Sequence, residues 1–272
     1  MSKKLFSHTF LLLVSILTII PLWVMFVTAF KSNSGVLGFA AINPFSSSWT
    51  IDNFITVWKK GNFGRYFLNS VMVTFFITVG NIIFDSMAAY ALARRKFRGK
   101  GLLMGVIALK LLIPSVVLMV PTFILINKIG LYDSYAAIIF PMLTETFGIF
   151  LIRQYMLSLP VELEESARLE GYSDWWIFIT IIFPLIMPVL AVVCIHSIMT
   201  SWNMYIYPLI LTSSDSMRTL PLGLAFFKSS NSTANTAQLM AGAVIASLPV
   251  IILFLIYQRK IISGLTKGAV KG

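Results

Sequence analysis

Charged side chains are rare in this sequence, and half of the acidic ones occur in one short segment. Glu162, Glu164, Glu165, Glu170 and Asp174 are five of the ten acidic residues in the 272-residue chain. In a chain that is otherwise mostly apolar, we expect such a segment to be presented to a binding partner. The simpler alternative is a solvated loop whose charges keep it out of lipid.

The order of residue types in this segment predicts two short helices joined by a corner. Pro160 suits the first turn of a helix, where a missing N–H costs nothing, and the glutamates that follow lie near the positive end of the helix dipole. Leu163 and Ala167 share one helix face. Gly171 is suited to a left-handed helix end, and Ser173 can cap a second helix that begins at the next residue.

Three ionisable residues fall inside apolar stretches, where a charge is costly. Asp85, Lys110 and Glu145 would each cost about 2.5–3.5 kcal/mol at the centre of a membrane helix, so we expect them to face other helices or water. An Asp85–Lys110 or a Lys110–Glu145 pair would satisfy this requirement. Such residues can line a substrate path or relay protons, or they can form a pair that only fixes helix register. His196 fits a hydrogen-bonded interior histidine better than a proton carrier.

Aromatic and amide side chains occur together near the end of one apolar stretch. Trp202, Asn203 and Tyr205 could hold a carbohydrate through ring stacking and hydrogen bonds, or they could belong to the aromatic belt of a membrane protein. Prolines also interrupt the apolar stretches, and each frees a backbone carbonyl that needs protein or water. They are Pro114, Pro121, Pro184, Pro188, Pro208 and Pro249.

The elements that must position these residues are membrane helices. The chain is 58% hydrophobic and 11% charged, with a mean hydropathy of +0.87, which is typical of an integral membrane protein. The net charge of +11 marks cytoplasmic loops and not nucleic-acid binding. The single cysteine, Cys194, lies in an apolar run, where a small buried side chain is expected.

Six apolar stretches are long enough to cross a bilayer, and their flanking charges predict an orientation. The predicted spans are 9–30, 66–93, 102–126, 135–152, 183–205 and 239–257. With an even number of spans, both termini lie on one side of the membrane. That side carries thirteen of the twenty-one cations, including the cluster at 94–100, and the other side carries seven. The excess places both termini and the acidic segment in the cytoplasm.

The acidic segment and its continuation resemble the EAA loop of the inner-membrane subunits of binding-protein-dependent ATP-binding-cassette (ABC) importers. The resemblance rests on Glu165-Ser166-Ala167, on Gly171 and on the run Ile181-Ile182-Phe183-Pro184. The family pattern is Glu-Ala-Ala, Gly and Ile-x-Leu-Pro, so that Ser166 and Phe183 are mild departures from it. Further stretches resemble the carbohydrate branch, in particular the maltose-type second permease subunit. They are Asn53-Phe54, 66–70, 89–100, Trp202-Asn203 and the tail 258–272.

This resemblance implies a fold and a division of the chain. The fold is an all-α polytopic membrane protein of the type I ABC importer class, with six transmembrane helices and cytoplasmic termini. Residues 1–65 would hold the first helix and an extracytoplasmic loop. Residues 66–258 would form a five-helix core with a coupling loop at 160–181, and 259–272 a cytoplasmic tail.

The resemblance also implies a role for particular residues. The coupling loop would dock in a groove on an ATP-hydrolysing subunit through Glu165, Ser166, Ala167, Gly171 and Pro184. In some members the tail reaches the ATPase subunits, which implies contacts from Lys267, Gly268 and Lys271. The candidate path-lining residues are Asp85, Lys110, Glu145, Trp202, Asn203 and Tyr205.

The implied function is ATP-driven import of a mono- or oligosaccharide across a bacterial cell membrane. The implied partners are a second, related permease chain, two ATPase subunits and an extracytoplasmic solute-binding protein. The chain contains no Gly-x-x-x-x-Gly-Lys-Ser/Thr loop, so we expect it not to be an enzyme, to carry no cofactor or metal and to leave ATP and Mg²⁺ to the ATPase subunits.

Three alternatives remain at this point. The chain could be an ABC permease for another solute, such as a phosphorylated glycerol or an amino acid. It could be an ion-coupled secondary transporter that uses Asp85, Lys110 and Glu145, although such proteins usually consist of two related halves and no internal repeat is evident. It could also be a membrane scaffold, which would not need an acidic docking loop with fixed long-range spacing.

Overall fold

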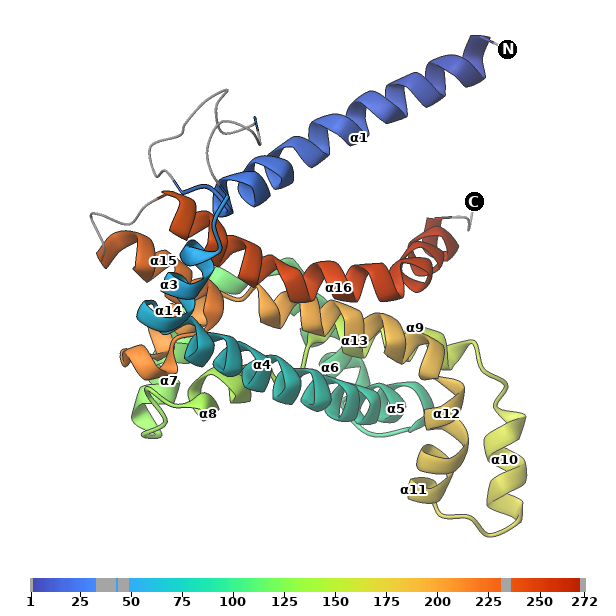
Figure 1. The fold of residues 1–272 in the computed structure, drawn as a ribbon. Coiled ribbons are helices and arrows are strands. Elements are labelled where there is room, and N and C mark those ends of the chain that lie inside the picture. The colour runs from blue at the N-terminus through green and yellow to red at the C-terminus, as the bar shows by residue number, and fades with distance from the viewer. Residues whose placement is uncertain (1, 33–42, 44–48, 231–235, 270–272) are drawn as a thin grey trace. The chain divides into compact units, whose positions relative to one another are not determined.

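A computed structural model describes residues 2–32, 43, 49–230 and 236–269 of the chain, and these residues are predominantly helical (Figure 1). The chain forms two compact units. The first consists of residues 1–68 with 218–253, and the second of residues 69–217 with 254–272. The all-α class predicted from the sequence is therefore confirmed for the described part of the chain.

The first unit joins the beginning of the chain to a late segment. Asn53 links two of its elements, because its amide donates hydrogen bonds to the carbonyls of Ala29 (2.8 Å) and Lys31 (2.9 Å). The Phe63 ring is fully buried and meets the Phe227 ring edge-on, 5.7 Å between centroids. The elements are α1 (Ser2–Ala29), α3 (Asp52–Lys60), the start of α4 (Phe63–Gly80), α15 (Leu220–Ser230) and the first part of α16 (Thr236–Ala269).

The second unit contains most of the residues singled out above. It begins in α4, which continues through a π-helical turn, Asn81–Asp85, into α5 (Ser86–Arg94). The middle elements are α6 (Lys100–Leu112), α7 (Met119–Lys128), α8 (Tyr135–Ile139) and α9 (Thr146–Leu157). The later ones are α10 (Glu162–Leu169), α11 (Asp174–Ile177), α12 (Phe183–Leu185), α13 (Met187–Trp202) and α14 (Ile206–Leu211). A second π-helical turn, Phe178–Ile182, lies between α11 and α12.

The described helices provide four to six candidate membrane spans. Four are continuous by length and apolar composition: Leu5–Ala29, Phe63–Arg94, Tyr135–Leu157 and Thr236–Gln258. Two helix pairs qualify only when each is taken together, Lys100–Leu112 with Ser115–Lys128 and Asp174–Leu185 with Met187–Trp202. The first pair is bent by 108° and the second by 77°.

These bends lie within the predicted third span, 102–126, and near the start of the predicted fifth span, 183–205. Pro114 lies at the first break and disfavours a helical conformation of Ile113, which is extended (ψ 120°), so α6 ends at Leu112. Pro188 occupies the first turn of α13 and Pro121 the first turn of α7, where no helical hydrogen bond is lost. Not every proline in the apolar stretches therefore frees a carbonyl.

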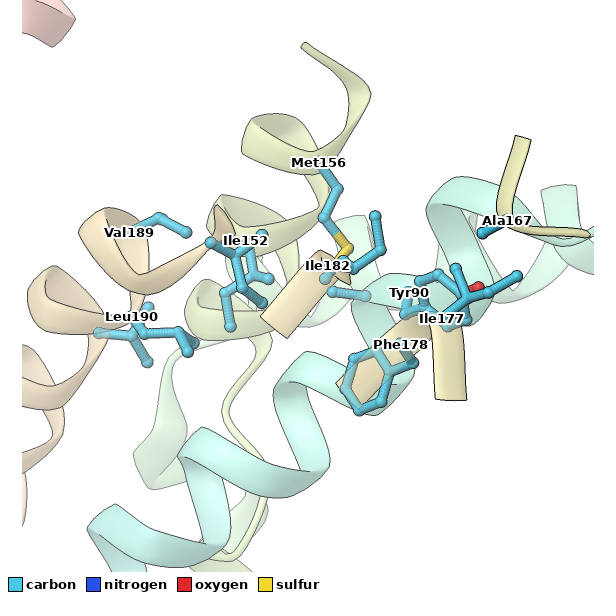
Figure 2. Packing of buried hydrophobic residues seen from close by; sticks show 12 residues of the cluster. Tyr90, Ile152, Met156, Ala167, Ile177, Phe178, Ile182, Val189 and Leu190 are labelled. Carbon is cyan, nitrogen blue, oxygen red and sulfur yellow. The ribbon is translucent and has the colours of Figure 1, made fainter. Parts of the chain in front are cut away.

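The principal apolar core of the second unit lies where α5, α9 and α13 meet the segment after α10. Figure 2 shows Tyr90, Phe178, Ile152 and Met156 among its members, with Ala167 as the contribution of α10. The rings of Tyr90 and Phe178 are 5.0 Å apart. Van der Waals packing is a main source of helix association in membranes, so this cluster fixes the helices around the acidic segment.

Candidate functional site

Residues 160–177 form two short helices joined by a tight turn, and we call this segment the acidic hairpin (Figure 1). Gly171 has the left-handed φ of +87°, as the sequence predicted. The N–H of Tyr172 donates to the carbonyl of Ala167, and that of Gly171 to the carbonyl of Arg168, both at 3.0 Å. This pair of bonds is the Schellman arrangement that ends a helix at a glycine.

The second half of the acidic hairpin begins as predicted. The hydroxyl oxygen of Ser173 accepts a hydrogen bond from the N–H of Trp176 at 3.4 Å, which caps α11. The first half begins slightly later than expected, because α10 starts at Glu162 and Pro160 precedes its first turn. The two helices therefore form a defined unit and not an irregular loop.

One of the five acidic residues is turned inward, which corrects the expectation that the whole segment is presented outward. The Glu164 side chain is 1% exposed, and its Oε1 lies 2.8 Å from Nε of Arg94 in an ion pair whose N–H is not aligned as a hydrogen bond. The other oxygen, Oε2, accepts from the Tyr90 hydroxyl at 3.3 Å and from Arg168 at 3.4 Å. Charge burial of this kind requires such partners.

Two arginines of the basic cluster at 94–100 pair with acidic side chains of the acidic hairpin. Besides Arg94, Arg95 pairs with Asp174 at 2.5 Å and donates a hydrogen bond to the Tyr90 hydroxyl at 2.7 Å. Arg168 also reaches Asp174, at 3.4 Å. The sequence suggested only a topological role for these cations. The spacing of Tyr90 to Arg94 and of Glu164 to Arg168, each four residues on a helix, is the signal that could have indicated two facing polar surfaces.

The outer surface of α10 is open to a partner. Glu165 and Ser166 are exposed, and the Leu169 side chain is 91% exposed, which is unusual for a leucine on a short helix. A groove of about 440 Å³ runs between α10 and the following segment, lined among others by Leu163, Ser166 and Trp176. Of the predicted coupling residues, Glu165, Ser166, Gly171 and Pro184 are exposed, whereas Ala167 is buried in the core.

The charges within the spans lie close together but do not pair as expected. Asp85 is fully buried, and its Oδ1 accepts the backbone N–H of Glu145 at 3.0 Å. A Cβ at Gly148 would lie 2.3 Å from Asp85 Oδ2, so only glycine allows this approach. Glu145 is extended and immediately precedes α9. Its backbone N–H, at the helix start where N–H groups have no partner within the helix, is the one that donates to the Asp85 carboxylate.

The side-chain partner of Glu145 is His196 and not Lys110. Glu145 Oε1 and His196 Nε2 lie 3.0 Å apart. Lys110 is exposed on α6, and none of the described acidic side chains lies within ion-pair distance of it. The predicted Asp85–Lys110 or Lys110–Glu145 pair is therefore wrong, while the assignment of His196 as a hydrogen-bonded residue is confirmed. The break before α9, which the sequence did not reveal, changes where Glu145 points.

A hydrogen-bond network that the sequence analysis missed lies beside these charges. Asn81, at the start of the first π-helical turn, donates to the carbonyl of Met142 at 2.7 Å. Its oxygen accepts from the hydroxyl of Ser197 at 2.7 Å, and that hydroxyl is also 3.3 Å from Thr78. Polar side chains of two spans and a backbone carbonyl of a third are thus connected, although nothing in the spacing of these residues along the sequence indicates it.

Two cavities share Glu145 as a lining residue. One, of about 340 Å³, lies around the break between α6 and α7 and also includes Lys110, Thr144 and Tyr207. The other, of about 110 Å³, includes Thr144 together with Asn81 and Ser201. The structure therefore brings Lys110 and Glu145 to one cavity without joining them in an ion pair.

The aromatic and tail residues lie elsewhere. Trp202 is buried, Asn203 donates to the carbonyl of Met199 at 2.8 Å, and Tyr205 is exposed just before α14. Lys267 and Gly268 belong to the last turns of α16, where only the backbone is described, and Lys271 lies outside the described residues. Among the residues searched, no group of three or more histidine, cysteine, aspartate or glutamate side chains could hold a metal ion.

Comparison with known proteins gives one family for most of the chain. Residues 85–267 match the family described as "Binding-protein-dependent transport system inner membrane component". An arabinooligosaccharides transport system permease protein of Halalkalibacterium halodurans is 36% identical over 261 residues, which cover 95% of this chain and 93% of that protein.

Other relatives differ in the sugar that they are named for. A trehalose transport system permease protein of Mycobacterium tuberculosis is 34% identical, covering 83% of this chain and 84% of that protein. A melibiose/raffinose/stachyose import permease protein of Bacillus subtilis is 33% identical, covering 93% and 91%. Among solved structures, a chain of a bacterial ABC transporter involved in the import of the acidic polysaccharide alginate superposes with a TM-score of 0.83 at 24% identity. The superposition covers 95% of this chain and 97% of that chain.

Proposed function

The chain belongs to the family of binding-protein-dependent transport system inner membrane components, and from this premise we propose that it is a permease subunit of an ATP-driven importer for a mono- or oligosaccharide. It is a multi-pass membrane protein and a transport component, not an enzyme. The proposal of a sugar follows the relatives, which are named for arabinooligosaccharides, trehalose and melibiose-type sugars. These names favour a sugar over glycerol phosphate, an amino acid or ion-coupled transport.

The proposed topology has six spans with both termini in the cytoplasm. It counts each bent helix pair as one span, so that the four continuous helices become six crossings. Residues 66–258 would form the transport core, with 160–181 as its coupling loop and 259–272 as a cytoplasmic tail. The excess of cations on the proposed cytoplasmic side supports this orientation.

The acidic hairpin is the single observation that carries the coupling part of the proposal. A short helix with a buried inner face and an outer face that exposes Glu165, Ser166 and Leu169 has the form of an insert for a groove on another protein. We assign that groove to an ATPase subunit. Gly171 ends the insert, Ala167 anchors it and Pro184 lies where the chain re-enters the membrane helices.

The remaining partners follow from the same scheme. We propose a second permease subunit of a different but related sequence, two ATPase subunits that hold ATP and Mg²⁺, and an extracytoplasmic solute-binding protein. Lys267, Gly268 and Lys271 would reach the ATPase subunits from the tail. Asp85, Lys110, Glu145, Trp202, Asn203 and Tyr205 stay proposals for the lining of the path, with Lys110 and Glu145 best supported because they border one cavity.

A single-cysteine crosslinking experiment tests the proposed function. The chain has one native cysteine, so Cys194→Ala gives a cysteine-free background for Leu169→Cys on the acidic hairpin and for Ser213→Cys as a control. We expect Leu169→Cys to capture an ATPase polypeptide in membranes of the native host, and Ser213→Cys not to.

Uptake assays complete the test. In cells that carry the whole system, we expect import of labelled oligosaccharide to stop when ATP is depleted and to survive an uncoupler that collapses ion gradients. Failure of Leu169→Cys to capture a nucleotide-binding polypeptide, together with import driven by an ion gradient alone, would refute the proposal.

A further inference from the structure

Apolar packing alone attaches α10 only weakly to the rest of its unit. Among the described residues of α10, Ala167 is the one member of the apolar core, whereas Leu163 is 41% exposed and Leu169 91% exposed. A single methyl group buries little surface. The remaining inward contact of α10 is the buried carboxylate of Glu164, so an ionic contact carries much of the attachment of this helix.

The partner of that carboxylate connects three elements at once. Arg94 ends α5, and its Nε meets Glu164 of α10 at 2.8 Å. Its Nη2 donates to the carbonyl of Met156 at 2.7 Å and to that of Leu159 at 2.8 Å, at the end of α9 and just beyond it. The two side chains are 6% and 1% exposed, so solvent screens this contact very little.

The geometry of the guanidinium gives its two hydrogen bonds to carbonyls fixed directions, while charge holds Glu164 beside it. The group is planar, always charged and has five N–H donors in a rigid arrangement, so it cannot rotate to satisfy one partner without losing another. Arg94 holds Met156 and Glu164, which lie on either side of the connection between α9 and α10. The connection is therefore clamped at both ends to the last turn of α5.

We propose that Arg94 and Glu164 are positioning residues that form a rigid joint, through which a displacement of α10 moves the ends of α5 and α9 together. This inference rests on the proposed function, because it assumes that an ATPase subunit moves α10. Without the joint, α10 could follow the ATPase while the membrane helices stayed in place. ATP would then be hydrolysed without sugar transport.

The test uses the complete importer, purified with its partner subunits and reconstituted in proteoliposomes. The solute-binding protein is added to the assay. The informative variant is the double replacement Arg94→Met with Glu164→Leu, because apolar residues of similar volume can replace a buried ion pair without unfolding the protein. Either single replacement would leave a buried group unpaired and could fail to fold. The readout is ATP hydrolysed per sugar imported.

We expect the double variant to assemble with its ATPase subunits and to hydrolyse ATP, with a ratio of ATP to sugar that is higher by about fivefold or more. Arg94→Lys keeps the charge but not the planar donors, and we expect an intermediate ratio. Arg153→Met is the matched control. Arg153 donates to the carbonyl of Leu92 at 3.2 Å and so links α9 to α5 without α10; we expect the wild-type ratio.

The possible results separate the two proposals. A wild-type ratio in the double variant, or an equal rise in Arg153→Met, would overturn the joint while leaving the proposed function intact. If the wild-type complex contains no ATPase subunit, or imports sugar without ATP, the proposed function fails and the joint with it.

Discussion

At the residue scale, several ionisable side chains of this protein have partners that the sequence analysis does not predict. Asp85 was correctly singled out as a costly charge, yet its partner is a backbone N–H at the start of α9 and not a cation. Glu164 was counted among acids expected to face a partner, yet it is buried against Arg94. Both outcomes depend on which helix faces lie together, and a single sequence contains no direct record of that register.

The pairing of Glu145 gives a prediction at this scale. A double-mutant cycle between Glu145→Gln and His196→Gln should show a coupling energy in the lower part of the range of about 0.5–3 kcal/mol, since both side chains are about one third exposed. The cycle between Glu145→Gln and Lys110→Met should be additive within about 0.5 kcal/mol. Denaturant unfolding of the detergent-solubilised protein measures both. A larger coupling to Lys110 than to His196 would contradict the structure.

Asp133 gives a second prediction, about acid sensitivity. Its carboxylate accepts hydrogen bonds from the N–H groups of Ser213 (2.9 Å) and Ser214 (3.0 Å) and from the Ser214 hydroxyl. The bond from the Ser214 hydroxyl is the main reason that the pKa of Asp133 is lowered, and partial burial opposes it. The contact between these two loops therefore links residues that are 80 positions apart in the sequence.

The sign of the effect follows from the direction of this pKa shift. Because the pKa of Asp133 is lower in the folded protein than the value of about 3.9 expected when unfolded, the stabilisation is complete above about pH 4 and is lost as pH falls through the folded pKa. Thermal unfolding of the purified protein between neutral and acid pH should show a loss of stability in acid that is smaller in Asp133→Asn. Identical pH profiles for the two proteins would exclude this role.

At the element scale, the length of the apolar runs predicts where helices occur but not where those helices are interrupted. Each of the six predicted spans has a helical counterpart, but the third and fifth are bent pairs, and the fourth, which passes as one span, has a short non-helical stretch at 143–145. The sequence analysis predicts no span between 205 and 239, whereas α15, Leu220–Ser230, lies there. The short apolar run from Leu220 to Phe227 carries that helix, and the serine, threonine and asparagine residues around it obscured the pattern.

Gly223 on α15 gives a prediction about packing. A Cβ at this position would lie 2.1 Å from Cδ2 of the buried Tyr66 ring, so Gly223→Ala must displace the ring or the helix. Overpacking of this kind typically costs about 1–3 kcal/mol. Gly105→Ala on α6 is the control, because a Cβ there meets nothing within 4 Å. Unfolding midpoints of the two variants should separate clearly, and equal midpoints would show that the contact is not present.

At the scale of the whole molecule, the chain's order does not match its compact units. The first unit combines residues 1–68 with 218–253, so the N-terminal helix shares a unit with α15 and the first part of α16. The family and the all-α class could be predicted from one motif and from composition. The interleaved units could not, because they depend on contacts between segments far apart in the sequence.

The proposed orientation gives a prediction for the intact protein. A fluorescent protein that matures only in the cytoplasm, fused after Gly272, should be fluorescent. In the cysteine-free background, Ser213→Cys should react with a membrane-impermeant thiol reagent in whole cells, while Leu169→Cys should react only after the membrane is opened. Labelling of Leu169→Cys from outside would reverse the orientation, and labelling of both positions from the same side would refute the span count.

The first π-helical turn has a consequence for insertions and deletions. A π-helical turn contains one residue more than an α-helical turn. The helices on its two sides therefore have the same relative orientation as in a regular α-helix that is one residue shorter. Deleting the exposed Ile83 within the turn should leave α5 in phase. Deleting the exposed Phe75 in the regular part of α4 would rotate one flank against the other by about 100°. The wide turn is thus the place where this span can lose a residue and still direct Arg94 toward Glu164.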